Sequence, residues 1–363
     1  MLHFNVVEHT VPCHHIRERP GEVYEPLWDD VYEEMSALKR RIRSIWIADV
    51  SHQGQSGVLN EPSWMDHARD LLGLIHRYQS DMPHPIIGVG HSMGGVQLAH
   101  LALIHPSLFQ SLILIEPPLR RENPSKKYAL GSTYRRDLWP SREDAINRFR
   151  ANKVFKDFDA HAFDDFVEYE LRDLPTELYP RYENHGTTPV SLTTTKAQEL
   201  YTYLWPTYQD GKVGLREGEW RREMRPEDRE EGHPFYRPVF LFHRLPQLRP
   251  SVLCIFGERS EISTTPVRRE RLEMTGSGVG GSGGTHRGRV KEVVLPTGHL
   301  VPMENVWECA RVSASFSHFE LTRWETDQHE FIQEWNAKPR ADKIVVDDKW
   351  KENIGSVAGK PRI

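Results

Sequence analysis

The sequence has 363 residues, which is longer than a typical domain but suits one large domain with an insertion. Hydrophobic residues make up 38% of it, enough for a sizeable core. The net charge of −5, without a basic cluster interleaved with aromatic residues, argues against a nucleic-acid partner.

The distribution of apolar, basic and cysteine residues argues against a membrane-spanning, secreted or disulfide-rich protein. No apolar run approaches the roughly 18 residues of a membrane span. Residues 1–5 do not begin a basic segment followed by a long apolar one, so we expect no secretory signal. Cys13, Cys254 and Cys309 are odd in number and scattered. This favours a reducing compartment over a disulfide framework or a metal cluster.

The first third of the chain begins with helix and strand patterns. Apolar residues at helical spacing predict an amphipathic helix over residues 24–39. Residues 45–48, Ile-Trp-Ile-Ala, are a candidate buried strand, and a turn-rich loop follows at residues 51–57. A second amphipathic helix follows Ser63, which is a suitable N-cap.

The most informative motif lies at residues 88–95, Gly-Val-Gly-His-Ser-Met-Gly-Gly. It follows an apolar strand-like run and precedes a helical pattern at residues 96–105. A G-x-S-x-G motif in this context is typical of a nucleophile elbow, in which a strained turn exposes the serine hydroxyl. We expect Gly90 and Gly94, two residues either side of Ser92, to let the strand and the helix approach closely.

A second buried strand follows at residues 112–115 and leads into Glu116. The strand–helix–strand alternation predicts a parallel sheet with right-handed crossovers. The pattern then becomes helical, charged and aromatic, without a strong strand, which predicts a helical lid inserted between sheet strands. In this lid we expect helices at residues 144–155, 162–171 and 196–204 and a solvated charged loop at residues 216–231.

The sheet resumes with strands at residues 252–256 and 290–295, separated by a Gly/Ser-rich loop at residues 276–284. A final amphipathic helix and a polar tail follow. The predicted organisation is an N-terminal half of the core at residues 1–119, the lid at 120–248, a C-terminal half of the core at 249–336 and the tail at 337–363.

These features resemble the α/β-hydrolase superfamily, because the elbow, the loop at residues 49–57 and the Gly-His pair beginning residues 298–304 lie in its order. Residues 46–54, Trp-Ile-Ala-Asp-Val-Ser-His-Gln-Gly, and 298–304, Gly-His-Leu-Val-Pro-Met-Glu, are similar to fungal peroxisomal hydrolases that include AK-toxin biosynthesis hydrolases. The resemblance covers about residues 22–335. It implies an α/β fold of the α/β-hydrolase type: a mostly parallel sheet flanked by helices, with an inserted helical lid.

Serine attack on an acyl carbon needs a base for the hydroxyl proton and an acid that orients the base. Ser92 is the candidate nucleophile. His299 is the candidate base, because it follows the last strand in a turn near the sheet edge at which the elbow lies. His91 adjoins the serine and cannot easily turn its ring onto that oxygen, so we expect it to line the substrate pocket.

The acid has two candidates. The usual position in the superfamily falls on Ser260, with Glu261 one residue later. The other place is the end of the preceding strand, where Glu116 stands 24 residues after the serine (116 − 92). Burying an unpaired carboxylate there would be costly, so we favour Glu116 and keep Glu261 as the alternative. A purely structural explanation is an ion pair between Glu116 and a lid arginine, Arg120 or Arg121.

An oxyanion hole needs two donors, and the Met93 N–H is one by its position after the serine. The other should come from a loop after an earlier strand. Residues 13–21 stand at the expected place but are polar and predict no strand; only residues 4–7 could form one. We therefore expect the first strands of the sheet to be lost. Removing one oxyanion donor costs roughly 10²–10³ in rate.

The predicted function is cofactor-independent serine hydrolysis of an ester, thioester or lactone with an apolar acyl part. The fungal resemblance implies secondary-metabolite (toxin) biosynthesis or peroxisomal lipid metabolism. The alternative is a catalytically impaired protein that serves as a binding or accessory factor, which the missing oxyanion strand favours.

The last three residues, Pro361, Arg362 and Ile363, resemble a peroxisomal address of the Ser-Lys-Leu type, although proline departs from it. They predict a peroxisomal import receptor as a partner. The alternative location is the cytoplasm.

Overall fold

A computed structural model describes residues 22–48, 50, 53, 66–121, 125–182, 186–203 and 239–355. Several predicted features lie outside the described residues: the segments at residues 4–7 and 13–21, most of the 51–57 loop, Ser63, the charged run at 216–231 and the last three residues.

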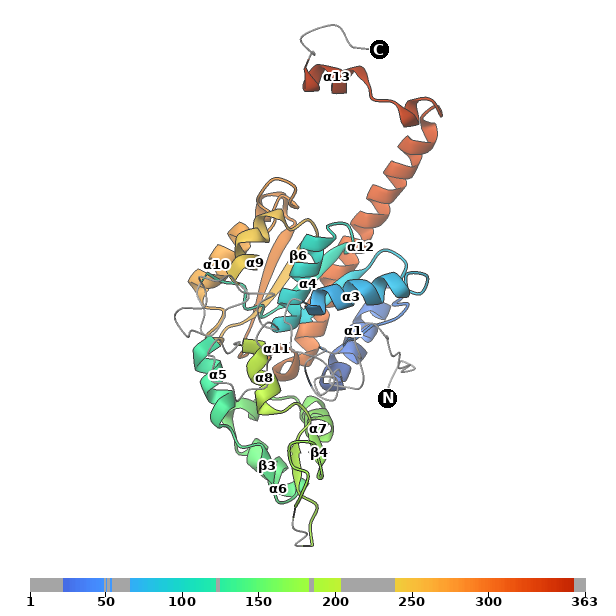
Figure 1. Ribbon diagram of the computed structural model, residues 1–363. Coiled ribbons are helices and arrows are strands. Elements are labelled where there is room, and N and C mark those ends of the chain that lie inside the picture. Colours follow the sequence, from blue (N-terminus) through green and yellow to red (C-terminus); the bar gives the residue numbers. More distant parts are fainter. Residues whose placement is uncertain are drawn as a thin grey trace. The chain divides into compact units, whose positions relative to one another are not determined.

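A four-stranded parallel sheet forms the centre of the fold, in the order β1-β2-β6-β7 (Figure 1). The two inner strands are buried along their whole length, as expected for a parallel sheet covered on both faces. The bounds are β1 Ile87–His91, β2 Ser111–Ile115, β6 Ser251–Gly257 and β7 Val290–Leu295.

Helices cover both faces of this sheet, because alternate residues of each strand point to opposite sides. In β2, Leu112 and Leu114 face one core and Ile113 faces the other. The first core also takes side chains from α3 (Asp66–Arg77), α4 (Met93–Ile104), α9 (Val239–Arg244) and α10 (Thr265–Met274). The second takes side chains from α1 (Glu25–Ala37), α11 (Val301–Glu304) and α12 (Val306–Ala337). The predicted parallel sheet flanked by helices is confirmed.

The segment between β2 and β6 contains helices and a second sheet. Its helices include the three that the sequence predicts, although α6 is shorter than expected and is followed by the 3₁₀ turn η2. A three-stranded antiparallel sheet, β3-β5-β4, accompanies them; periodicity did not indicate these strands because each has only two or three residues. The bounds are α5 Ser125–Tyr134, β3 Leu138–Trp139, α6 Arg142–Arg150, η2 Lys153–Phe155, α7 Ala160–Tyr169, β4 Leu171–Asp173, β5 Val190–Leu192 and α8 Lys196–Tyr203.

The prediction of a strand at residues 45–48 is wrong. These residues are irregular, and Ile47 is 50% exposed. Trp46 and Ala48 pack beside Leu74 and Met82 without joining the sheet. A short apolar run becomes a strand only where a neighbouring strand accepts its backbone hydrogen bonds. Within the described residues β1 is therefore an edge strand, and the expected loss of earlier strands stays a prediction.

The chain divides into two compact units, residues 1–318 and 319–363. The second unit contains the end of α12 and the short helix α13 (Asp348–Ile354), whose first turn is capped by the Asp347 carboxylate. All the elements that surround Ser92 and His299 belong to the first unit.

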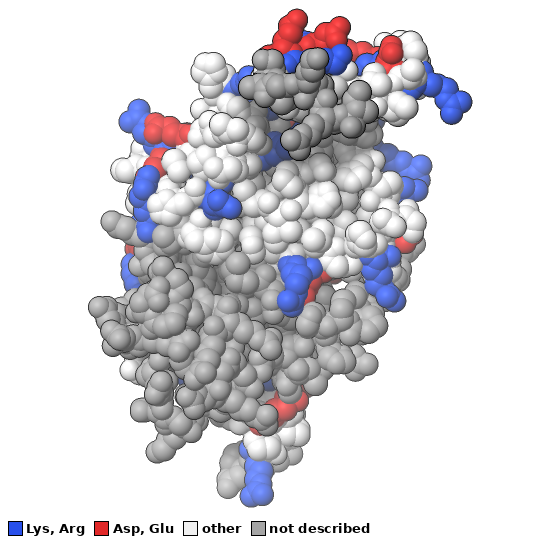
Figure 2. Space-filling view, turned by 45° about the horizontal axis from the view of Figure 1, so that its top comes forward, with Lys and Arg blue, Asp and Glu red and all other residues white. Residues whose placement is uncertain are grey.

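Charged side chains of both signs are interspersed over the described part of the surface in Figure 2. Among the described residues, no helix combines the length and the apolar character of a membrane span. The same part of the chain holds no group of three or more His, Cys, Asp or Glu side chains able to bind a metal ion. Burial raises the pKa of the Cys254 and Cys309 thiols to about 12, so neither thiol is reactive.

Candidate active site

Ser92 lies in the turn between β1 and α4 with a φ of 50° and a ψ of −119°. A residue with a Cβ rarely adopts such a backbone conformation. Three backbone hydrogen bonds hold it: the Ser92 N–H donates to the Ile115 carbonyl at 2.8 Å, and the Ser92 carbonyl accepts from the Gly95 N–H at 3.1 Å and from the Val96 N–H at 3.4 Å. This geometry is that of a nucleophile elbow.

Two glycines make the elbow possible, and one of them is not the glycine that the motif suggests. A Cβ at Gly90 would lie 2.6 Å from backbone atoms of Gly94 and Gly95, and one at Gly95 would lie 2.9 Å from the Gly90 oxygen. A Cβ at Gly94 would meet nothing within 4 Å. The close approach of strand and helix therefore depends on Gly90 and Gly95, and the expected steric role of Gly94 is wrong.

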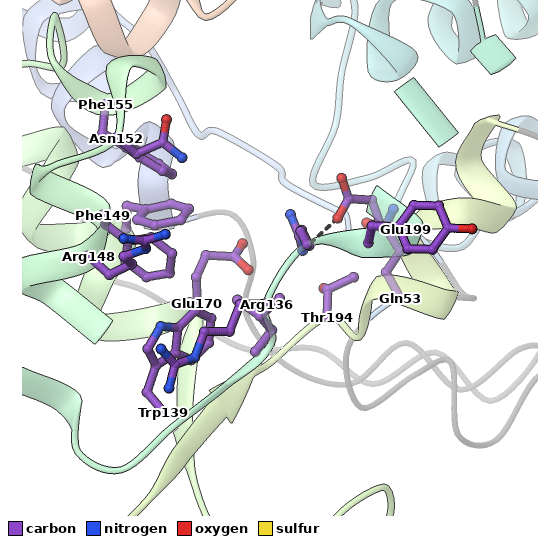
Figure 3. A pocket seen from close by; sticks show the side chains of 14 residues that line it. Gln53, Arg136, Trp139, Arg148, Phe149, Asn152, Phe155, Glu170, Thr194 and Glu199 are labelled. Atoms are coloured by element: carbon purple, nitrogen blue, oxygen red, sulfur yellow. Dashed lines mark ion pairs between the residues drawn. The ribbon is translucent and has the colours of Figure 1, made fainter. Parts of the chain in front are cut away.

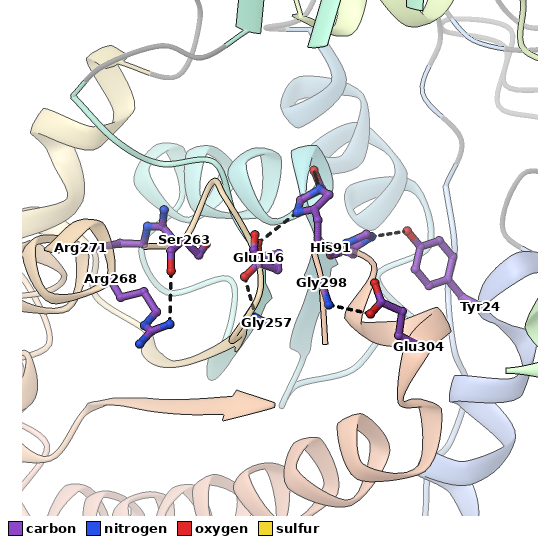
Figure 4. A network of polar contacts seen from close by, with 12 residues as sticks. Tyr24, His91, Glu116, Gly257, Ser263, Arg268, Arg271, Gly298 and Glu304 are labelled. Carbon is purple, nitrogen blue, oxygen red and sulfur yellow. Dashed lines mark hydrogen bonds and ion pairs between the residues drawn. The ribbon is translucent and has the colours of Figure 1, made fainter. Parts of the chain in front are cut away.

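Ser92, His299 and Glu116 form one chain of hydrogen bonds. The Nε2 atom of His299 is 3.0 Å from the Ser92 Oγ, and its Nδ1 atom is 3.1 Å from the Oε2 atom of Glu116. Figure 4 labels Glu116 in this network. A carboxylate can only accept, so Nδ1 carries the proton and Nε2 is free to accept the serine proton. The three groups are placed as a nucleophile, a base and an orienting acid must be.

The Glu116 carboxylate is completely buried, and donors surround it. The Gly257 N–H donates to its Oε1 at 2.8 Å, and the Ser260 hydroxyl donates to its Oε2 at 2.5 Å. The backbone of Glu116 has a φ of 48°, in the left-handed region, and its N–H donates to the Ile255 carbonyl. Together with His299, these donors offset the cost of removing a charge from water.

The other acid candidate lies in different surroundings. The Glu261 side chain is 69% exposed and forms an ion pair with Lys127. Ser260, at the usual acid position, instead donates its hydroxyl to Glu116. Arg121 pairs with Glu270, so this lid arginine does not pair with Glu116. The structure brings Glu116, and not Glu261, to His299.

The loop that carries His299 is held by contacts on both sides. The Gly298 N–H donates to the Glu304 carboxylate at 2.6 Å, and Glu304 in turn pairs with Arg259. A Cβ at Gly257 would lie 1.9 Å from the Gly298 oxygen, so glycine is required where β6 meets this loop. The loop therefore has little freedom to move the imidazole away from Ser92.

His91, which the sequence places in the substrate pocket, contacts the catalytic loop. Its Nε2–H donates to the backbone carbonyl of His299 at 2.9 Å, and the Tyr24 hydroxyl donates to its Nδ1 at 2.9 Å. Burial and the nearby His299 lower the pKa of His91 to about 3, so its imidazole is neutral at physiological pH. Its observed contacts support the backbone of His299, and no local sequence signal pointed to Tyr24.

Met93 is the first residue of α4. The N–H groups of a helix's first turn have no acceptor within the helix, so the Met93 N–H is available beside the Ser92 hydroxyl. Residues 13–21, the expected place of the second oxyanion donor, lie outside the described residues.

The sequence profile of the family described as alpha/beta hydrolase fold matches residues 26–241. The chain belongs to the α/β-hydrolase family. It is 34% identical to the type I acyl-CoA thioesterase mpaH' of Penicillium brevicompactum over 416 aligned positions, covering 96% of this chain and 94% of that protein. It is 30% identical to the abhydrolase domain-containing protein AKT2 of Alternaria alternata, over 76% of this chain and 99% of that protein.

The fold is also that of solved α/β-hydrolases. The peroxisomal alpha-beta-hydrolase Lpx1 of Saccharomyces cerevisiae superposes with a TM-score of 0.54 over 88% of this chain and 83% of its own, at 17% identity. The E-2-(acetamidomethylene)succinate hydrolase gives a TM-score of 0.50 over 79% of this chain and 86% of its own, at 16% identity. These likenesses confirm the fold.

The thioesterase alignment also shows a difference in length. It has 416 positions, whereas this chain has 363 residues, so at least 53 positions (416 − 363) face a gap in this chain. The thioesterase therefore carries segments that have no counterpart here.

The space around the elbow glycines predicts different effects for alanine at Gly90 and at Gly94. Gly90→Ala should lower the free energy of unfolding by about 1–3 kcal/mol, because its Cβ meets backbone that cannot retreat. Gly94→Ala should change it by less than about 1 kcal/mol, because the space there is open. Urea denaturation of both variants beside the wild type measures the difference; equal losses would contradict the assignment.

The lowered pKa of His91 predicts a dependence of stability on pH. The unfolded chain binds a proton at His91 below a pH of about 6.5, and the folded chain does so only near 3. Stability is therefore complete above 6.5 and falls as the pH drops through this window. When the pH falls from 7.5 to 5, the free energy of unfolding of His91→Gln should decrease by about 1–2 kcal/mol less than that of the wild type. His67, whose pKa burial lowers to about 4, remains in both proteins as an internal reference.

Proposed function

We propose that this protein is a serine hydrolase that cleaves a thioester of an apolar acid, with coenzyme A as the leaving group. The observation that carries the proposal is the continuous hydrogen-bond chain from the Ser92 hydroxyl through His299 to the buried Glu116 carboxylate. The thioester as substrate is supported by the names of the relatives that are 34–36% identical over more than nine-tenths of this chain.

The geometry supports an acyl-enzyme mechanism. The His299 Nε2 takes the proton as the Ser92 oxygen attacks the thioester carbonyl, and the negative Glu116 stabilises the imidazolium that forms. The carbonyl oxygen becomes negative and faces the Met93 N–H. The carbon–sulfur bond then breaks and His299 returns the proton to the thiolate. A water, deprotonated by His299, hydrolyses the acyl-serine and regenerates the hydroxyl.

The acid can act from β2 because the neighbouring strands are in register. In the parallel sheet His91 pairs with Ile115, so Ser92 and Glu116 leave adjacent strands at the same level. Ile115 pairs in turn with Ile255, just before the Gly257 donor. All the proposed catalytic groups thus meet at the carboxyl edge of the sheet, where α/β proteins place their sites.

The second candidate function is a binding or accessory protein without turnover. It is favoured by the edge position of β1, because an oxyanion donor is expected from a strand beyond that edge.

For the cellular location we propose the peroxisome, with an import receptor that binds Pro361, Arg362 and Ile363, and we keep the cytoplasm as the alternative. The name of the Saccharomyces neighbour gives the peroxisome some support.

The first test removes the proposed nucleophile. Ser92→Ala should lower kcat for acyl-CoA hydrolysis by about 10⁴-fold or more, because no other group can form the acyl-enzyme. A fluorophosphonate probe should label the wild type and not this variant. Ser277→Ala, which changes an exposed serine in the Gly/Ser-rich loop, is the matched control and should keep full activity. Folded wild-type protein that neither hydrolyses thioesters nor reacts with the probe would favour the accessory function.

The second test moves the acid. Glu116→Gln should lower kcat by about 10³–10⁴-fold, because an amide neither orients nor stabilises the imidazolium. Adding Ser260→Asp to that variant should recover at least about tenfold, because the Ser260 Oγ lies 2.5 Å from the Glu116 oxygen that faces His299. Glu261→Gln is the control and should leave kcat within about twofold. A loss in Glu261→Gln as large as that in Glu116→Gln would overturn the assignment.

A further inference from the structure

A cavity lies within the segment between β2 and β6, and the proposed catalytic groups do not line it. Its volume is about 670 Å³, within the range of about 300–1,000 Å³ typical of small-molecule sites. Neither Ser92, His299 nor Glu116 lines it. Figure 3 shows the side chains around it, which come from the helices and short strands between α5 and α8, from the turns that join them, and from Gln53.

Three arginines line this cavity, and two of them have no carboxylate partner among the described residues. Arg135 pairs with Glu199 at 2.6 Å. Arg136 donates from Nε to the Leu138 carbonyl, which leaves the outer nitrogens of its guanidinium group for a ligand. Arg148 is exposed on α6, and no ion pair holds it in the described part of the chain. Planar guanidinium groups of this kind bind phosphate through paired hydrogen bonds.

An aromatic wall stands beside these arginines. The Phe149 ring lies 5.2–5.3 Å from the rings of Trp139, Phe155 and Phe166. Trp139 is 2% exposed, and its Nε1–H has no acceptor in the described part of the structure. A buried donor without an acceptor is costly, so a lining residue with such a group points to a ligand that supplies one. Aromatic faces in turn bind flat rings.

These features together select the kind of ligand. An apolar acyl chain would leave Arg136 and Arg148 without anions, and a bare phosphate would leave the aromatic wall unused. A phosphorylated nucleoside satisfies both, and Asn152 and Thr194 add polar groups that can bond to a purine. We propose that this cavity binds the 3′-phosphorylated adenosine end of the acyl-CoA substrate, with its phosphates on Arg136 and Arg148 and its base against the aromatic wall.

The cavity is coupled to the catalytic loop through a shared side chain. Phe166 lines the cavity and also packs in the cluster that contains Tyr24 and Leu300. Leu300 follows His299 directly, and Tyr24 donates to His91. A nucleotide held apart from Ser92 suits coenzyme A, because a long flexible pantetheine arm separates its phosphates from the thioester. This assignment rests on the proposed function, since it concerns the same substrate.

Adenosine 3′,5′-bisphosphate is a probe that tests the cavity without turnover. Isothermal titration calorimetry should show binding to the wild type and equally to Ser92→Ala. Arg136→Gln and Arg148→Gln should each weaken it by about tenfold, the effect of losing one charge-assisted hydrogen-bond pair. Arg150→Gln is the matched control: Arg150 is exposed on the same helix and lies over the Phe163 ring, outside the cavity. Inorganic phosphate binding as tightly as the bisphosphate would overturn the nucleotide assignment.

Kinetics separate the cavity from the catalytic centre. For an acyl-CoA, both variants should raise KM by about tenfold at unchanged kcat. For the same acyl group on N-acetylcysteamine, which lacks the nucleotide, neither constant should move. If the bisphosphate binds in a way that depends on Arg136 and Arg148 but no thioester is hydrolysed, the proposed function is contradicted and the cavity assignment is supported. Acyl-CoA hydrolysis with a KM indifferent to both arginines would sink the cavity assignment and leave the proposed function standing.

Discussion

The buried carboxylate of Glu116 is the constraint on which the geometry of the site depends. A charge without exposed surface must be matched by donors, and here they come from three places: Gly257, Ser260 and His299. These donors follow or end two further strands, β6 and β7, so one carboxylate ties together the carboxyl ends of three neighbouring strands. The left-handed backbone at Glu116 is tolerated because this network over-determines it.

The sequence could reveal groups whose chemistry depends on local pattern. The strand–turn–helix motif predicts Ser92, the turn after the last strand predicts His299, and the cost of burying a carboxylate at a strand end favours Glu116. The structure brings these three side chains together. The hydrogen bonds that hold these residues in place could not be predicted from the sequence, because they join residues that are far apart along the chain. Tyr24 bonds to His91 across 67 positions, and Ser260 bonds to Glu116 across 144. The wrong prediction of a strand at residues 45–48 has the same cause. A strand forms only beside a neighbouring strand, and the residues of the segment itself do not show whether one is present.

The edge position of β1 affects the two parts of the site differently. Alternate residues of β1 are only half-buried, whereas β2 is buried throughout. Ser92, the proposed nucleophile, is nevertheless held by the bond from its N–H to Ile115, by the β1–β2 register and by the Gly95 N–H of α4, which donates to the Ser92 carbonyl. Its geometry therefore does not need strands beyond β1. An oxyanion donor from beyond that edge would need such a strand. The thioesterase relative carries segments that this chain lacks.

Separating recognition from chemistry would account for arginines in a cavity that Ser92 does not line. A phosphate bound on Arg136 and Arg148 contributes equally to the ground state and to the transition state, because the reaction does not change its charge. Such uniform binding concentrates the substrate on the enzyme without accelerating the bond-breaking step. Guanidinium groups in a cavity that Ser92, His299 and Glu116 do not line would let the protein hold a polyanion without altering the hydrogen bonds of the proposed catalytic groups.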